Sequence, residues 1–294
     1  MTPYPHLFSP LQIGEITLRN RVVQSAHGKY FTADGIDSER TAAYQLERAR
    51  GGAGLLITDN RMVHPSSVAA FSRISPSQWR TEQLDADRAI VSAVHEHGAA
   101  IIAQLSHYGN KGASDGSDDL RVLWGPSGVR APAFNETPKA MERADIADAI
   151  EAFVLGARHA RDAGFDGVEI HFAHGYLLHQ FLSPLFNLRD DEYGGSLEAR
   201  MRFPLEIVRA VRELARDDFV VGVRVSMDDY AAGGLGIRDG VRVTQALVDG
   251  GLIDYLNVTA GMTNMGWAVA PTRLEDGWLL EHQAAIKSAA DATP

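Results

Sequence analysis

Three side chains that can bind or transfer a proton, His171, His174 and Tyr176, lie within six positions of one another. They follow a short apolar run over 167–171 that is typical of a buried parallel strand. In sheets and barrels of parallel strands, reactive groups gather at the carboxyl ends of the strands. Any one of the three residues could simply close the strand. The three together indicate an active site.

The same histidines raise the alternative of a metal site. His171, His174 and His179 could bind zinc if their side chains converged, because zinc accepts imidazole ligands in groups of three or four. The chain has no H-E-x-x-H motif, however, and it contains no cysteine. We therefore predict no metal ion.

Strand parity brings further polar residues to the same region. Gln104, His171 and Arg224 lie near the carboxyl ends of three predicted strands, on the face opposite to Ile101, Ile170 and Val223 of the same strands. A buried arginine requires an anionic partner. That partner is either Glu169, in an internal ion pair, or a bound ligand, and parity leaves both alternatives open.

The elements that position these residues alternate along the chain as apolar strands and amphipathic helices. This pattern is typical of a parallel barrel or of a doubly wound sheet. The predicted strands are 22–25, 55–59, 100–105, 167–171, 219–225 and 254–259. The predicted helices are 38–50, 81–97, 145–163, 197–216, 239–250 and 279–290. Asp145 is a suitable N-cap for the third helix, and Gly164 is a suitable stop.

Two segments depart from this alternation. Residues 7–18 alternate apolar and polar side chains around Gly14, which predicts a small hairpin that caps one end of the fold. Residues 106–143 are rich in glycine, serine, aspartate and proline, and we predict a long loop over the mouth of the barrel. No interdomain linker interrupts the chain, so we expect a single domain over 1–294.

The bulk composition narrows the class of protein. The chain has 294 residues, 45% of them hydrophobic, and a formal net charge of -10. This charge argues against non-specific binding of nucleic acid. The amino terminus lacks the pattern of a secretory signal, and no apolar run is long enough to span a bilayer. We expect a cytoplasmic enzyme that acts on a small molecule, without a membrane or nucleic-acid partner.

Longer motifs surround the histidine and tyrosine cluster. Residues 171–184 read H-F-A-H-G-Y-L-L-H-Q-F-L-S-P, and residues 189–196 read R-D-D-E-Y-G-G-S. With the segments 7–11, 18–23 and 254–261, this pattern resembles the old yellow enzyme family, in particular the subgroup with 2,4-dienoyl-CoA reductases and trimethylamine dehydrogenase. The resemblance implies a (β/α)8 TIM barrel that binds FMN. Only about six βα units are visible, so we predict a C-terminally incomplete barrel with an N-terminal hairpin.

The resemblance also implies roles for the clustered residues. His171 and His174 would bind the carbonyl oxygen of an activated alkene, hydride from reduced FMN would reach the β-carbon, and Tyr176 would give a proton to the α-carbon. Gln104 and Arg224 would bind the flavin pyrimidine, where the cation stabilises the reduced, anionic flavin. NADH or NADPH would supply the electrons.

Further flavin contacts are implied near the first two strands. The segment with Ser25 and Ala26 matches the one whose backbone meets the flavin, and Asn60 follows the second predicted strand at a flavin-contacting position. Gly28 lies near the place where relatives carry a threonine or cysteine that tunes the flavin. That side-chain contact would be absent here.

We therefore predict an FMN-dependent NAD(P)H oxidoreductase that reduces the C=C bond of α,β-unsaturated carbonyl compounds. One alternative is a flavin-dependent amine dehydrogenase or demethylase, for which Tyr30, Tyr108 and Trp267 are scattered candidates for an aromatic substrate site. Another is a non-catalytic remnant that cannot hold FMN. The sequence leaves open the substrate, the choice of NADH or NADPH, and whether the chain forms a homo-oligomer.

Overall fold

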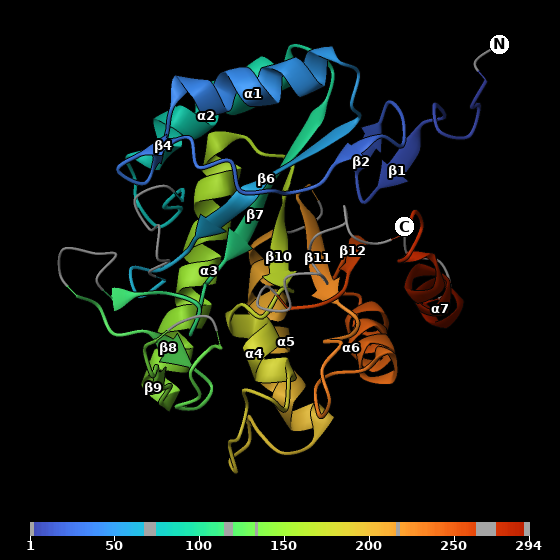
Figure 1. The fold of residues 1–294 in the computed structure, drawn as a ribbon. Coiled ribbons are helices and arrows are strands. Elements are labelled where there is room, and N and C mark those ends of the chain that lie inside the picture. The colour runs from blue at the N-terminus through green and yellow to red at the C-terminus, as the bar shows by residue number, and fades with distance from the viewer. Residues whose placement is uncertain are drawn as a thin grey trace.

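The computed structural model describes residues 3–67, 75–114, 120–132, 135–215, 218–262 and 275–290. Its centre is a six-stranded sheet in the order β12-β11-β10-β7-β6-β3, in which every neighbouring pair is parallel (Figure 1). The strands are β3 (Val23–Gln24), β6 (Leu55–Met62), β7 (Ala100–Ser106), β10 (Gly167–Phe172), β11 (Val220–Ser226) and β12 (Tyr255–Thr259). All six predicted strands are confirmed.

Helices follow the strands and cover one face of the sheet. They are α1 (Glu39–Arg50), α2 (Gln83–His95), α3 (Arg143–Ala163), α4 (Leu177–Leu182), α5 (Leu197–Ala215), α6 (Ile237–Asp249) and α7 (Leu280–Ala290). The main core lies between the helices and this face. Its members include Val168 and Val223 from the strands and Phe153 and Val208 from α3 and α5, all fully buried. This outward-facing apolar set agrees with the predicted strand parity.

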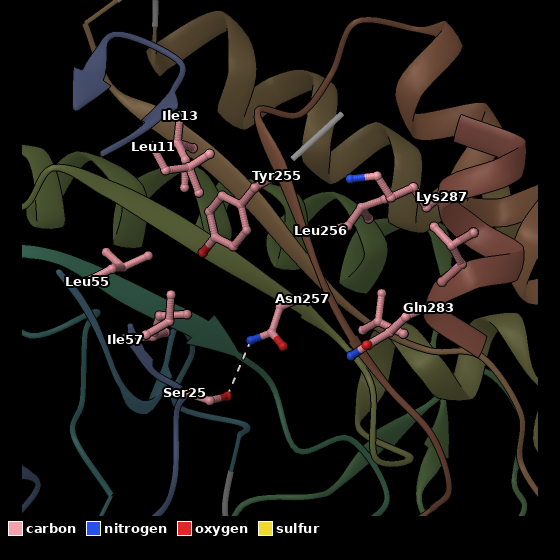
Figure 2. A pocket seen from close by; sticks show the side chains of 13 residues that line it. Leu11, Ile13, Ser25, Leu55, Ile57, Tyr255, Leu256, Asn257, Gln283 and Lys287 are labelled. Carbon is pink, nitrogen blue, oxygen red and sulfur yellow. Dashed lines mark hydrogen bonds between the residues drawn. The ribbon is translucent and has the colours of Figure 1, made fainter. Parts of the chain in front are cut away.

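The sheet curls so that its two edge strands, β3 and β12, approach each other. Nδ2 of Asn257 in β12 lies 3.4 Å from Oγ of Ser25, directly after β3 (Figure 2). A curled parallel sheet with helices on its outer face is the architecture of a partial (β/α)8 barrel rather than of a doubly wound sheet. The prediction of an incomplete barrel with about six βα units is confirmed.

The predicted hairpin closes the amino-terminal end of the strands. It consists of β1 (Leu11–Ile13) and β2 (Ile16–Leu18), paired antiparallel, with Gly14 between them at a φ of 52°. A positive φ favours glycine, which carries no Cβ. Ile13 and Leu18 of the hairpin join a small apolar cluster at the beginnings of the strands, with Leu55, Ile57, Ile102, Val220 and Tyr255.

The amino end of α3 differs from the sequence-based expectation. The N-cap is Glu142 and not Asp145, which lies three residues inside the helix. The two form a capping box, in which Oδ2 of Asp145 accepts a hydrogen bond of 2.7 Å from the backbone N–H of Glu142. The carboxyl end is as predicted, with Gly164 in the left-handed region at a φ of 92°.

The second strand of the sheet is longer than predicted. β6 continues past residue 59 to Met62, and its pairing with β7 contains an irregularity between Ile57 and Asn60. This irregularity has the character of a β-bulge, which turns the bulged strand and re-aims its side chains. As a result, Asn60 lies inside the strand, opposite Gln104 of β7, and not after its end.

The segment 106–143 is only partly the loop that the composition predicts. It contains two short strands, β8 (Trp124–Gly125) and β9 (Lys139–Ala140), which pair in parallel. The Trp124 ring stacks on His64 and His107, which follow β6 and β7, so the segment packs at the carboxyl ends of the strands. A further small hairpin joins β4 (Thr32–Ala33) and β5 (Ile36–Asp37). No helix in the described ranges is both long and apolar enough to cross a bilayer.

Candidate active site

A cavity of about 450 Å³ lies at the carboxyl ends of the strands. Each of the six strands contributes one lining residue near or just beyond its carboxyl end, and the other lining residues come from loops. The lining consists of Ala26, His27, Gly28, Asn60, Gln104, His171, His174, Tyr176, Arg224, Thr259, Trp278 and Leu279. The volume is in the range typical of small-molecule sites. The structure thus brings together all of the predicted site residues except Ser25.

The two histidines face each other nearly at right angles. Their ring centroids are 5.1 Å apart with an interplanar angle of 88°. The backbone N–H of Ala173 donates to Nδ1 of His171 at 3.2 Å, which assigns the proton of the neutral ring to Nε2. Burial, reinforced by the nearby Arg224 charge, holds the pKa of both histidines well below the ordinary value of 6.5. Both are therefore neutral near pH 7, and each has one N–H to donate.

A sharp turn after β10 brings the tyrosine back to the histidines. His174 and Gly175 both adopt left-handed backbone conformations, with φ values of 59° and 71°. The turn places the Tyr176 ring 5.0 Å from the His171 ring, at an angle of 86°. Tyr108 approaches from the other side, also at 5.0 Å and edge-on. A phenol and two neutral imidazoles around one space can bind a carbonyl oxygen and supply a proton.

A second group of polar residues lies beside this cluster. The carboxylate of Glu169 is fully buried and accepts hydrogen bonds from Gln104 Nε2 (2.6 Å), Tyr255 OH (3.0 Å) and Asn257 Nδ2 (3.0 Å). Burial raises the pKa of Glu169, and the nearby Arg224 opposes the shift. Glu169 is thus held by three neutral donors, and Gln104 is fixed in place by the carboxylate.

Arg224 contacts the backbone rather than a carboxylate. Its Nη1 donates to the carbonyl oxygen of Ala26 at 3.1 Å. Within the part of the chain that the structure describes, Arg224 forms no ion pair, and its buried Nε has no hydrogen-bond partner. A buried cationic donor in a cavity lining fits an electron-rich ligand. With Gln104 and Asn60 in the same lining, the site fits the pyrimidine ring of a flavin.

Ser25 lies elsewhere. It lines a neighbouring pocket of about 390 Å³, between the hairpin, the edge strands and α7 (Figure 2). That pocket is mostly apolar, with Leu11, Ile13 and Leu55 among its lining residues. The Ser25 side chain does not line the first cavity, and the role of its backbone at a flavin stays a prediction.

Sequence reasoning missed three residues of the cavity. The hydroxyl of Thr259 lies 3.2 Å from Nε2 of His174, and Trp278 and Leu279 also line the cavity. The position of Thr259 at the carboxyl end of a predicted strand is a sequence signal that could have placed this residue in the site. No pattern in the sequence marks Trp278 or Leu279. Trp267 lies outside the described residues, and those residues contain no group of side chains that could hold a metal ion.

Comparison with known proteins identifies the family. The model of the NADH:flavin oxidoreductase / NADH oxidase family matches residues 6–265. The chain belongs to this family. The NADPH dehydrogenase of Geobacillus sp. (strain WCH70) is 41% identical over 273 residues, which are 91% of this chain and 75% of that protein.

Longer relatives match as well. The N,N-dimethylglycine/sarcosine dehydrogenase of Chromohalobacter salexigens is 38% identical over 259 residues, 86% of this chain but only 36% of that protein. The chain thus spans well under half of this longer relative. Among solved structures, morphinone reductase in complex with tetrahydroNAD superposes with a TM-score of 0.81 at 28% identity, covering 98% of this chain and 79% of that one.

Membership in the NADH:flavin oxidoreductase / NADH oxidase family confirms several predictions. The chain is related to FMN-dependent NAD(P)H oxidoreductases on a TIM barrel, so the predicted resemblance, fold, enzyme class and cofactors hold at the level of the family. The relatives are named for different activities, among them NADPH dehydrogenase, alkene reductase and demethylase. The family alone therefore does not fix the substrate.

Proposed function

We propose that this chain is an FMN-dependent NAD(P)H oxidoreductase that reduces a C=C bond conjugated to a carbonyl group, and that residues 1–294 act as one flavin-binding domain. The observation that carries the proposal is the convergence of His171, His174 and Tyr176 on the cavity that Gln104 and Arg224 also line. These are the groups that such a reaction requires, because it develops negative charge on oxygen and consumes a proton at carbon.

The chain's own residues supply binding, orientation and the proton. Arg224, Gln104 and Asn60 would hold FMN, which when bound supplies hydride from NAD(P)H to the β-carbon. The neutral imidazoles of His171 and His174 donate hydrogen bonds to the carbonyl oxygen, and these bonds strengthen as enolate charge develops. Tyr176 then gives its phenolic proton to the α-carbon and regains one from water. One hydride and one proton are added, and the substrate leaves as the saturated carbonyl compound.

Flavin binding is the first test. FMN is titrated into the purified chain and followed by quenching of flavin fluorescence, with riboflavin as the phosphate-free comparison. We expect FMN to bind, to be reduced anaerobically by NADH or NADPH, and to be reoxidised by cyclohex-2-enone. A chain that takes up neither flavin would be the non-catalytic remnant, and the proposal would fail.

The role of Tyr176 is tested by Tyr176→Phe, which removes the phenolic proton and keeps the ring. We expect the rate of enone reduction to fall by roughly 10²- to 10⁴-fold, the usual contribution of a general acid. The rate of flavin reduction by NAD(P)H should not change, because that step needs no proton from Tyr176. Stopped-flow absorbance of the flavin separates the two half-reactions. Equal losses in both would contradict the proton-donor role.

A second candidate function is oxidative demethylation of an amine. Two of the more similar relatives carry amine substrates in their names, a dimethylglycine/sarcosine dehydrogenase and a probable N-methylproline demethylase. Trp278 and Tyr176 both line the cavity, and aromatic faces attract organic cations. Anaerobic mixing with sarcosine or N-methylproline distinguishes the candidates. Bleaching of the oxidised flavin by these amines, without reoxidation by enones, would favour the demethylase.

A further inference from the structure

A buried lysine, Lys111, lies against the turn that carries the histidine and tyrosine. It follows β7, and only 3% of its surface is exposed. Its Nζ donates to the backbone carbonyl oxygen of His174 at 2.5 Å. A Cβ added to Gly175 would lie 2.5 Å from the same Nζ, so the amine packs directly on the turn.

The other end of the same peptide unit is also held. The backbone N–H of Gly175 donates to Nδ1 of His179 at 2.6 Å, and Nε2 of His179 in turn donates to Oδ1 of Asp229 at 2.7 Å. Ser183 Oγ and the backbone N–H of Leu235 complete the shell of that carboxylate, at 2.7 and 2.8 Å. The His174–Gly175 peptide is therefore fixed at its carbonyl by Lys111 and at its N–H by the His179–Asp229 pair.

This peptide needs such support. His174 is not glycine, yet its φ is 59°, a left-handed conformation that costs free energy and persists only where the surroundings enforce it. The orientation of the peptide sets the direction of the His174 ring and the path of the chain into Tyr176. A loss of support at the carbonyl would therefore displace two residues of the cavity at once.

Lys111 also places a positive charge next to the tyrosine. Its Nζ lies 5.6 Å from the centroid of the Tyr176 ring, within the range of a cation–π contact. The charged and titratable groups around it are Tyr176, Asp229 and the histidines 171, 174 and 179. Burial lowers the pKa of Lys111 to about 7, and Asp229 opposes the shift. A buried amine with a strongly lowered pKa is characteristic of functional sites.

We propose that Lys111 is a positioning residue for the alkene-reduction step: it holds the His174–Gly175 peptide, and its ammonium favours release of the Tyr176 proton. The inference rests on the proposed function. Negative charge grows on the phenol as the proton leaves. A cation 5.6 Å from the ring centroid corresponds, in a protein's effective dielectric, to a rate factor of roughly 10- to 100-fold. The neutral amine still donates to the carbonyl of His174 but no longer offers this charge.

The decisive measurement is the pH profile of the second half-reaction. The bound flavin is first reduced photochemically, and the reduced enzyme is then mixed with cyclohex-2-enone. Flavin reoxidation is followed between about pH 6 and 8.5, a range that spans the lowered pKa of Lys111. The wild-type rate should fall as pH rises through about 7. Lys111→Met should be slower at pH 6 by roughly 10- to 100-fold and flat with pH. Lys111→Arg should keep a high rate across the range.

Controls separate this effect from general damage. Lys139→Met removes a lysine of β9 outside the cavity and should leave both half-reactions and the pH profile unchanged. Retention of the wild-type inflection near pH 7 in Lys111→Met would overturn the inference, as would a stably folded Lys111→Arg with the profile of Lys111→Met.

A readout without turnover keeps the inference separate from the proposed function. Amide hydrogen exchange of the peptide that covers residues 174–177, measured by mass spectrometry, should be faster in Lys111→Met than in the wild type and restored in Lys111→Arg. Unchanged exchange in Lys111→Met overturns the positioning role. A different outcome is that exchange is faster in Lys111→Met, while the wild type binds FMN but reduces no enone. Lys111 would then still be a support of the turn, and only the proposed function would be refuted.

Discussion

At the scale of single residues, the flavin side of the site combines neutral donors with the cation Arg224 and the anion Glu169. His171 and His174 lose their charge to burial, so they act as hydrogen-bond donors rather than as positive charges. Arg224 and Glu169 keep opposite charges in the same region without a direct ion pair among the described residues. Their balance sets the electrostatic potential that a bound flavin would experience.

This balance can be measured through the flavin's midpoint potential. Glu169→Gln removes a negative charge and should raise the potential by on the order of 30 mV, because a more positive site favours the reduced, anionic flavin. Arg224→Gln should lower it by a similar amount. Reference-dye titration gives the values, with the exposed Glu198→Gln as a control that should not shift. Shifts of the two site variants in the same direction would contradict the electrostatic account.

At the scale of elements, β11 fits between β10 and β12 because it carries a glycine, Gly222, where a side chain would meet its neighbours. Gly222 of β11 pairs with Glu169 on one side and with Tyr255 on the other. The Tyr255 ring lies over this glycine, which lets its hydroxyl reach the Glu169 carboxylate at 3.0 Å. A Cβ at Gly222 would be only 2.1 Å from the ring. The lack of a side chain at Gly222 therefore makes room for Tyr255 to join the hydrogen bonds of Glu169, which also hold Gln104.

Gly222→Ala should consequently disturb both stability and the site. We expect a loss of about 1–3 kcal/mol in the free energy of unfolding, the usual penalty of overpacking, together with weaker FMN binding. Urea unfolding and flavin titration provide the two values. Gly128→Ala is the matched control, since an added Cβ there has its nearest neighbour at 3.8 Å. It should change stability by less than about 0.5 kcal/mol, and an equal loss in both variants would refute the close-approach argument.

At the scale of the whole molecule, several histidines are buried in the neutral form. Burial lowers the pKa of His107 to about 3, and those of His171 and His174 lie well below 6.5. The unfolded chain binds these protons more readily than the folded chain below pH 6.5. Stability is therefore present above that pH and is lost as the pH falls. Asp37, whose pKa burial raises to about 6, acts in the opposite direction over part of this range.

The contribution of one histidine can be isolated with His107→Asn. Between pH 6.5 and about 4, the variant should lose stability less steeply than the wild type, by up to about 1.4 kcal/mol per pH unit for one proton. Urea unfolding at a series of pH values measures the slope. The exposed His6→Asn should keep the wild-type slope. An unchanged slope in His107→Asn would show that this side chain has the same pKa in the folded and the unfolded protein.

Much of the fold is predictable because its signals are local. Alternation along each strand and the periodicity of the helices follow from geometry within a few residues, so all six strands and the inward faces of Gln104, His171 and Arg224 can be derived. The close spacing of His174 and Tyr176 after a strand likewise indicates the site from the residues themselves. The family membership extends these local patterns to a barrel and a flavin.

The sequence by itself therefore determined the strands, the inner face and the close grouping of His171, His174 and Tyr176 in this protein. Only the tertiary structure decided which groups meet across elements: the bulge that re-aims Asn60, the capping box of Glu142, the approach of Thr259 and Trp278 to the cavity, and the contact of Lys111 with the histidine turn. Each of these depends on packing between segments far apart in the chain. Such contacts carry no local periodicity, since their free energy arises only when the sheet curls and its loops meet.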